Sequence, residues 1–370
     1  MYLLYFLFLY IKVKKTVKEY KEKKVLFILK KREDYGPKHH DHKSLSTGLY
    51  NSARFVNEML VENGINSHMV VVNDNNDIDR EVTKHRPTHV VIEALWVVPE
   101  KFAILHKLHP NVKWIIRMHS EIPFIANEGN AMTWLGEYVK YENVSIAFNA
   151  KRILKDFKFY IKTEMSWSEK EVDHRVLYFP NYFPQDYKVK KYDKKKEVLN
   201  VACFGAVRPL KNHLNQALAA LRFAESLGKH LHFHINVGRF EMKGDPVYKN
   251  LKGMFDQLSN SHHKLIEHEW MPREVFLELC EKMDIGMQVS FSETFNIVGC
   301  DLISQGVPLI GSAEIVWMNK LYMADPTSTD CMVNKLKRLY FHPYFNVITN
   351  QLLLTRYTNT SKNIWVSYFK

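Results

Sequence analysis

The chain has only four cysteines among its 370 residues, and they are widely spaced. Cys203, Cys280, Cys300 and Cys331 lie mostly in apolar segments, so the sequence does not have the pattern of a disulfide framework or a zinc site. We therefore expect reduced cysteines that belong to the core, and a cytoplasmic location.

The sequence also lacks an apolar run long enough to cross a bilayer. Residues 1–11 are almost entirely apolar, but a transmembrane helix needs roughly twenty such residues. A positively charged segment before them and a small-residue cleavage site are both missing, which disfavours a signal peptide. We expect residues 1–23 to form an extension outside the folded core. A weak peripheral contact with a membrane surface is the alternative interpretation.

No repeat of the solenoid type is present, and the length predicts more than one domain. Strand-like and helix-like patterns alternate along the chain, which is typical of an α/β fold. Helical stretches separate the predicted strands of the first half, which indicates a doubly wound parallel sheet. These predicted strands are residues 24–29, 67–72, 88–95, 113–119, 145–149 and 176–181.

Residues 185–197 are dominated by lysine and have no apolar period, which indicates a linker. We therefore expect one Rossmann-like domain over residues 24–184 and a second over residues 198–345. Residues 346–370 would form a helical tail. The cleft between the two domains is the natural ligand site.

The most informative segment is 292–312, which reads SETFNIVGCDLISQGVPLIGS. Its pattern predicts the end of a strand, a turn that holds Glu293, a short helix that holds Asp301, and a buried strand over residues 307–310. If both carboxylates are helical they lie about 12 Å apart. They are then too far apart to share a proton, but they can bind hydroxyl groups at two ends of one long polar ligand.

The same turn is a candidate anion site. Thr294, Phe295 and Asn296 are expected to place free backbone N–H groups at the N-terminus of the predicted helix, and such groups favour an anion. Glu293 lies beside that site. The segment therefore points to a phosphorylated ligand.

A second segment carries two cations. Residues 199–205 are a predicted strand that ends at Gly205, and a helical pattern follows over residues 214–224. Arg208 and Lys211 lie on the loop between them, at the carboxyl edge of the sheet where open α/β folds bind ligands.

These motifs resemble those of the retaining glycosyltransferases of the GT-B fold, family 4 (glycosyltransferase group 1). The family signature is a Glu, seven residues and a second Glu, then a Gly-x-Pro strand; here the second carboxylate is Asp301, one methylene shorter. The run of residues 124–129 is also similar to glycosyltransferases encoded by tailed bacteriophages. The resemblance implies two Rossmann-like, doubly wound domains that face each other across a cleft, with the acceptor side in the N-terminal domain and the nucleotide sugar in the C-terminal domain.

The resemblance also implies roles for particular residues. Glu293 would hold hydroxyl groups of the sugar, and Asp301 the ribose. His119, at the end of the strand 113–119, matches a histidine that lies near the transferred sugar; a structural histidine is the alternative. The predicted catalytic residues are Glu293, His119, Arg208 and Lys211. The predicted donor-binding residues are Gly205, Arg208, Lys211, Glu293, Thr294, Phe295, Asn296 and Asp301.

The reaction so implied moves a sugar from a nucleoside diphosphate sugar to a hydroxyl acceptor with retention and without a bound metal. His39, His40, Asp41 and His42 are metal-ligand types, but no third partner group lies near them in the sequence, so an acceptor contact or a solvated loop is the preferred interpretation. The acceptor is a glycan, a lipid-linked molecule or a nucleic acid.

Two alternatives follow from charge and from the departures in the motif. The net charge of +12 attracts phosphates, so a phage-type enzyme that glucosylates flipped or single-stranded DNA bases is one. Its location would be the host cytoplasm. A non-catalytic module that binds nucleotide or glycan is the other, because of Asp301 and the short spacing from Arg208 to Lys211.

Overall fold

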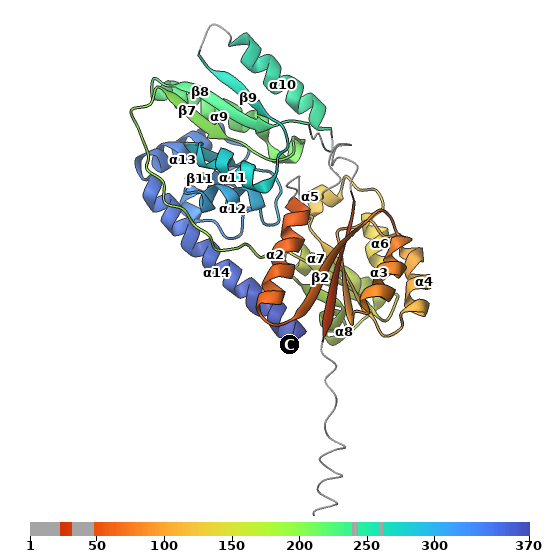
Figure 1. Ribbon diagram of the computed structural model, residues 1–370. Coiled ribbons are helices and arrows are strands. Elements are labelled where there is room, and N and C mark those ends of the chain that lie inside the picture. Colours follow the sequence, from red (N-terminus) through yellow and green to blue (C-terminus); the bar gives the residue numbers. More distant parts are fainter. Residues whose placement is uncertain (1–22, 32–47, 239–240, 242, 259–261) are drawn as a thin grey trace, which may run out of the picture.

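A computed structural model describes residues 23–31, 48–238, 241, 243–258 and 262–370. The extension 1–22 and the histidine cluster at residues 39–42 lie outside the described residues. The rest folds around two parallel sheets with helices on both faces (Figure 1).

The first sheet has the strand order β2-β1-β3-β4-β5-β6, all parallel. Its strands are β1 (Lys24–Lys30), β2 (Asn66–Val72), β3 (His89–Glu93), β4 (Lys113–Met118), β5 (Val144–Phe148) and β6 (Val176–Tyr178). The helices around it are α2 (Gly48–Glu62), α3 (Asp77–His85), α4 (Pro99–Leu108), α5 (Ile122–Ile125), α6 (Ala131–Tyr138), α7 (Lys151–Met165) and α8 (Glu169–Arg175).

The second sheet has the order β11-β10-β7-β8-β9 and is also parallel. Its strands are β7 (Val198–Ala202), β8 (His230–Asn236), β9 (Lys264–His268), β10 (Ile285–Gln288) and β11 (Leu309–Gly311). The short 3-10 helices η1 (Pro209–Lys211) and η2 (Lys320–Tyr322) lie in its loops. Its α-helices are α9 (His213–Ser226), α10 (Gly244–Gln257), α11 (Arg273–Glu281), α12 (Ile297–Ser304) and α13 (Thr329–Phe341). The prediction of two Rossmann-like sheets is confirmed.

The strand order determines where a ligand can bind. In the second sheet the order reverses between β7 and β10, which are direct neighbours. The loops that follow these strands diverge to opposite faces of the sheet and leave a crevice between them, the usual ligand position in open α/β folds. The predicted site residues lie in these two loops, apart from His119, which follows β4, and Asp301, which lies in α12.

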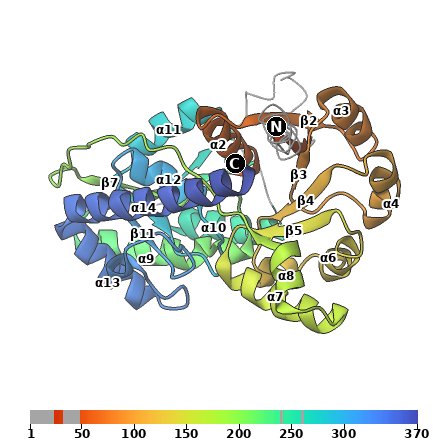
Figure 2. The ribbon, with the colours of Figure 1, turned by 90° about the horizontal axis from the view of Figure 1, so that it is seen from below.

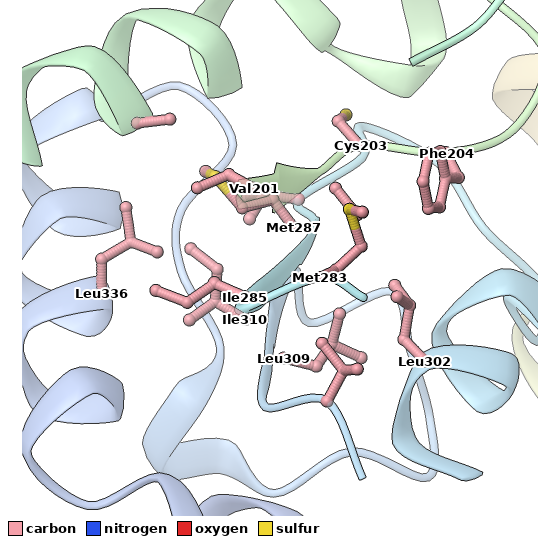
Figure 3. Close-up of a cluster of buried hydrophobic side chains, with 14 of the residues drawn as sticks. Val201, Cys203, Phe204, Met283, Ile285, Met287, Leu302, Leu309, Ile310 and Leu336 are labelled. Atoms are coloured by element: carbon pink, nitrogen blue, oxygen red, sulfur yellow. The ribbon is translucent and has the colours of Figure 1, made fainter. Parts of the chain in front are cut away.

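The core behind this crevice is mainly aliphatic, with Phe204, Met283 and Met287 among its side chains (Figure 3). Val201 of β7, Ile285 of β10 and Leu309 of β11 are buried in one cluster, together with Leu302 of α12 and Leu336 of α13. β10 and β11 are buried at every residue, because helices cover both faces of this part of the sheet, and their sequences are accordingly mostly apolar. The cysteines are free thiols; Cys203, Cys280 and Cys300 are buried and Cys331 is partly exposed.

A long C-terminal helix, α14 (Pro343–Phe369), joins the two halves (Figures 1 and 2). Near its start, Asn346 bonds the backbone N–H and C=O of Leu309 in β11, both at 2.9 Å. Near its end, Trp365 stacks on Phe179 at 4.2 Å and donates to Pro180 O at 2.8 Å. Among the described residues, no helix is long and apolar enough to cross a membrane.

Candidate active site

A cavity of about 230 Å³ opens at the crevice between the loops after β7 and β10. Its lining includes every predicted site residue, namely His119, Gly205, Arg208, Lys211, Glu293, Thr294, Phe295, Asn296 and Asp301. The carboxyl end of β4 and the start of α2 close it from the first half of the chain, since His119 and Gly48 also line it. Residues from both halves of the chain therefore share one cavity.

The loop after β7 is held by the backbone of Gly205. Gly205 has φ +116°, a conformation that side-chain-bearing residues rarely adopt, and its N–H donates to Asn236 Oδ1 at 2.9 Å. Arg208 follows on the same loop and bonds Glu241 Oε2 at 3.0 Å. Its guanidinium also lies 4.9 Å from the ring centroid of Phe124, which belongs to α5 on the other side of the cleft.

Lys211 and Glu293, which both line this cavity, form an ion pair. The side chain of Lys211 is 11% exposed and that of Glu293 is 8% exposed, so both groups are largely withdrawn from water. An ammonium has three donors and a carboxylate two acceptor oxygens. Each group therefore retains hydrogen-bonding capacity beyond the pair.

The turn after Glu293 has a different geometry from the one predicted. Helix α12 begins only at Ile297, and Asn296 is its N-cap, in the left-handed region at φ 61°. Asn296 Oδ1 accepts from Gly299 N at 2.7 Å, and its amide donates to Gln288 Oε1 at 2.9 Å. The expectation that residues 294–296 form the helix N-terminus is therefore wrong for Thr294 and Phe295, which lie two residues and one residue before the N-cap. The 12 Å separation assumed a helical Glu293, which the structure contradicts.

Phe295 turns its side chain away from the cavity. The ring is buried and stacks on Tyr357 of α14 at a centroid distance of 5.4 Å. The backbone carbonyl of Phe295 accepts a hydrogen bond from Trp317 Nε1 at 2.7 Å. Phe295 can therefore contact a ligand only through its main-chain atoms. The ring instead anchors the turn to the core.

Asp301 lies in α12 and is buried against a cation that the sequence did not reveal. Its Oδ1 accepts from Arg273 of α11 at 2.5 Å. Arg273 in turn lies over the rings of Phe55 and Phe183, at 4.8 and 5.6 Å. Burial raises the pKa of Asp301 to about 6, although Arg273 acts in the opposite direction. The charge on this carboxylate is therefore sensitive to mildly acidic pH.

The ring of His119 is positioned by a buried ionic network of Glu93 and Arg117. Its Nε2 bonds Glu93 at the end of β3, and Glu93 also accepts from Arg117 Nη1 at 3.0 and 3.2 Å. Burial and the positive charge of Arg117 lower the pKa of His119, against the effect of Glu93. A neutral ring that donates through Nε2 has an acceptor at Nδ1. Arg117 also donates to Asn181 Oδ1 at 2.6 Å.

A second cavity of about 440 Å³ adjoins the first. The two share His119, Arg208, Glu293 and Thr294 among their lining residues, while Glu121, Phe124 and Glu128 line the second alone. His119 and Glu293 thus stand at the boundary, where a group held in one cavity meets a group held in the other.

Contacts across the cleft fix the Glu293 turn against the first half of the chain. Arg152 of α7 donates to Glu293 O at 3.0 Å and to Glu314 at 2.7 and 2.8 Å. Thr294 Oγ1 donates to His119 O at 3.2 Å and accepts from Asn149 at 3.0 Å. The part of the chain that the structure describes contains no group of three or more His, Cys, Asp or Glu residues placed to hold a metal ion.

Several of these residues were not predicted. The sequence did contain a signal for Glu93 and Arg117. Each is a charged residue within a predicted buried strand, and a buried charge requires a partner. No such signal exists for Arg152 and Arg273, because an arginine near a helix start is usually solvated. Asn236 is also indistinguishable in sequence from an ordinary strand-end residue.

No family model and no curated protein matches this sequence. Solved structures match its fold. A UDP-forming α,α-trehalose-phosphate synthase from Burkholderia vietnamiensis has 9% identity and a TM-score of 0.67, over 94% of this chain and 96% of that one. The sucrose-phosphate synthase of Thermosynechococcus elongatus has 11% identity and a TM-score of 0.62, over 90% and 94%.

The E. coli trehalose-6-phosphate structure bound with UDP-2-fluoro glucose has 11% identity and a TM-score of 0.66, over 93% of this chain and 98% of that one. At such identities the likeness concerns the fold. It extends over 90–94% of this chain. The GT-B architecture, two Rossmann-like domains facing each other across a cleft, is thus established.

Proposed function

We propose that this protein is a glycosyltransferase that moves a sugar from a nucleoside diphosphate sugar to a hydroxyl group, with retention of the anomeric configuration. The observation that carries the proposal is that Arg208 and Lys211 share one cavity with the Glu293 turn, at the point where the strand order reverses. Fold neighbours described as UDP-forming support it. The spacing of Glu293 and Asp301 supports the family 4 resemblance, and the run of residues 124–129 supports the phage-type one.

The cations would stabilise the leaving diphosphate. As the glycosidic bond breaks, negative charge builds on the phosphate oxygens, and donors that are already in place lower the barrier. Lys211 uses one donor on Glu293 and has others for phosphate. Arg208 would break its 3.0 Å hydrogen bond to Glu241 and bind the diphosphate, which carries more negative charge. The amides at the start of α12 would complete the anion site.

The carboxylates would hold the two ends of the donor. Glu293 would accept from hydroxyl groups of the sugar, and the pair with Lys211 fixes its orientation. Asp301 would accept from the ribose, deeper in the cavity. His119, with an acceptor nitrogen at the boundary of the two cavities, would orient a hydroxyl close to the reacting carbon. Retention follows from the family resemblance, and no side chain is assigned as a covalent nucleophile.

We also propose that no metal takes part, because protein cations supply the positive charge that the leaving group needs. Free thiols at all four cysteines fit the proposed cytoplasmic location, where nucleotide sugars would be the donors.

The second cavity would receive the acceptor. Its described lining includes the carboxylates of Glu121, Glu128, Glu241 and Glu293 with one guanidinium, that of Arg208. Cations pair with three of these carboxylates, namely Glu121, Glu241 and Glu293, so the described lining has no surplus of positive charge. Such a lining suits an uncharged hydroxyl, as in a glycan, better than the phosphate-rich backbone of DNA, and we rank DNA-base glucosylation below it.

A binding module remains the second candidate, because Arg208 and Lys211 are already paired with carboxylates. Incubation with a panel of nucleotide sugars, with and without simple sugar acceptors, distinguishes the two. We expect nucleoside diphosphate to be released, and release to fall by roughly 10²-fold or more in Glu293→Ala and Arg208→Ala. Lys155→Ala, on an exposed part of α7 outside both cavities, is the control. Binding without turnover across the panel would make the chain a module.

A further inference from the structure

The outer side of α14 carries a row of exposed apolar residues. Phe345, Ile348 and Leu352 are 52%, 54% and 65% exposed. Their spacing of three and four residues places them on one face of the helix, and Arg356 continues the row one turn further. The opposite face is buried against the rest of the protein. Figure 2 shows α14 running along the surface from the second sheet to the first.

A groove of about 690 Å³ lies beside the end of this row, between α14, the start of α7 and the loop before η2. Lys151, Lys320 and Arg356 line it, and no Asp or Glu is among its lining residues. Within the described residues, none of these three cations forms an ion pair. Leu353 and Val316, exposed by 36% and 47%, lie in the same groove and extend its apolar surface.

The C-terminal part of the chain, which includes α14, carries charge of one sign. From residue 331 to residue 370 the chain has six Lys and Arg residues and no Asp or Glu. A protein partner would need carboxylates and apolar groups in a matching pattern, whereas an anionic bilayer offers phosphates above apolar chains along its whole surface. The helix as a whole is only weakly amphipathic. The surface that matches a bilayer interface is therefore the apolar row together with the cations of the adjoining groove.

We infer that this α14 face docks on a membrane that contains anionic phospholipid. Phe345, Ile348 and Leu352 enter the boundary between headgroups and acyl chains, and Lys320 and Arg356 bind headgroup phosphates in the adjoining groove. The helix lies in the plane of the interface and does not cross it, in agreement with the lack of a spanning helix among the described residues. This inference does not depend on the sugar transfer proposed above.

Flotation of the full chain with lipid vesicles tests it. Vesicles of phosphatidylcholine with phosphatidylglycerol should bind the protein. With vesicles of phosphatidylcholine alone, the bound fraction should be lower by about tenfold or more. Ile348→Asp/Leu352→Asp should lose that binding, as should Lys320→Gln/Arg356→Gln, which leaves the apolar row unchanged. Phe159→Asp is the matched control, because Phe159 is 74% exposed on α7, and it should bind as the unaltered protein does.

Three outcomes would overturn the inference. The first is no binding to anionic vesicles, and the second is binding that both double variants retain, which would assign it to another part of the chain such as residues 1–22. The third is a dimer in solution that only the Asp variant disrupts, because the row would then be an interface between two copies. Circular dichroism of each variant verifies that it folds.

Discussion

Lowering the pH should weaken binding of the donor through Asp301. Burial raises its pKa to about 6, so its ionised fraction falls roughly tenfold between about pH 8 and about pH 5. If the ionised carboxylate holds the ribose, the affinity for a nucleoside diphosphate such as UDP should fall by about the same factor. Isothermal titration calorimetry across this range measures it.

Asp301→Asn is the control that isolates this carboxylate. Phosphate itself titrates near pH 6, so the informative quantity is the ratio of the two proteins' affinities at each pH. The variant should bind about tenfold more weakly than the unaltered protein at pH 8, and the ratio should approach one in acid. A ratio that stays constant with pH, or a variant that binds as well as the unaltered protein, refutes the reasoning.

The same titration should appear in the free energy of unfolding with the opposite sign. The folded pKa of about 6 exceeds the ordinary 3.8, so the protonated form is the one that folding favours. The stability from this group is present below about pH 3.8 and is lost as the pH rises through about 6, by about 3 kcal/mol in all. Urea unfolding of the unaltered protein and Asp301→Asn measures the difference.

Other predictions concern the ionic network of Glu93 and Arg117 beside His119, the anchoring of the end of α14, and the proposed independence of turnover from metal ions. Glu93→Gln should lower the free energy of unfolding by about 3–5 kcal/mol, because Arg117 then stays buried without a counter-charge; Glu137→Gln breaks only a surface pair and should cost less than about 1 kcal/mol. Equal costs in urea unfolding would contradict this. Trp365→Ala should cost about 3–5 kcal/mol because the ring is fully buried against Phe27 and Phe179; an unchanged melting temperature would show that the helix end is not anchored there. Turnover should survive EDTA, and its loss with recovery on adding Mg²⁺ or Mn²⁺ would make the reaction metal-dependent.

Much of the fold could be predicted because the buried parallel strands are short apolar runs. Residues 113–119 and 199–205 are examples, and the structure places β4 and β7 there. A glycine after an amphipathic pattern also predicts a helix end, and Gly64, Gly228 and Gly306 all have positive φ just beyond a helix. The crossing of α14 could not be predicted. Its amphipathic character is weak, since it packs on two different surfaces along its length.

The candidate site could be predicted only as two loops. Each loop follows its own strand, and only the sheet order brings Lys211 and Glu293, 82 positions apart, into contact. The partners of the predicted residues are less visible still. Arg273 reaches Asp301 from another helix, and Glu93 reaches His119 from a neighbouring strand. Such pairs depend on register and helix packing, for which local patterns contain no information.

The central claim is that Arg208, Lys211 and the turn after Glu293 together bind one diphosphate. Calorimetry of UDP and of uridine, with the unaltered protein and with Arg208→Ala/Lys211→Ala, tests it most directly. We expect UDP to bind far more tightly than uridine, and this gap to shrink by roughly 10²-fold or more in the double variant, since each lost charge-assisted contact is worth about 1.5–3 kcal/mol. A gap that the double variant retains in full, with Lys155→Ala unchanged, would contradict the account.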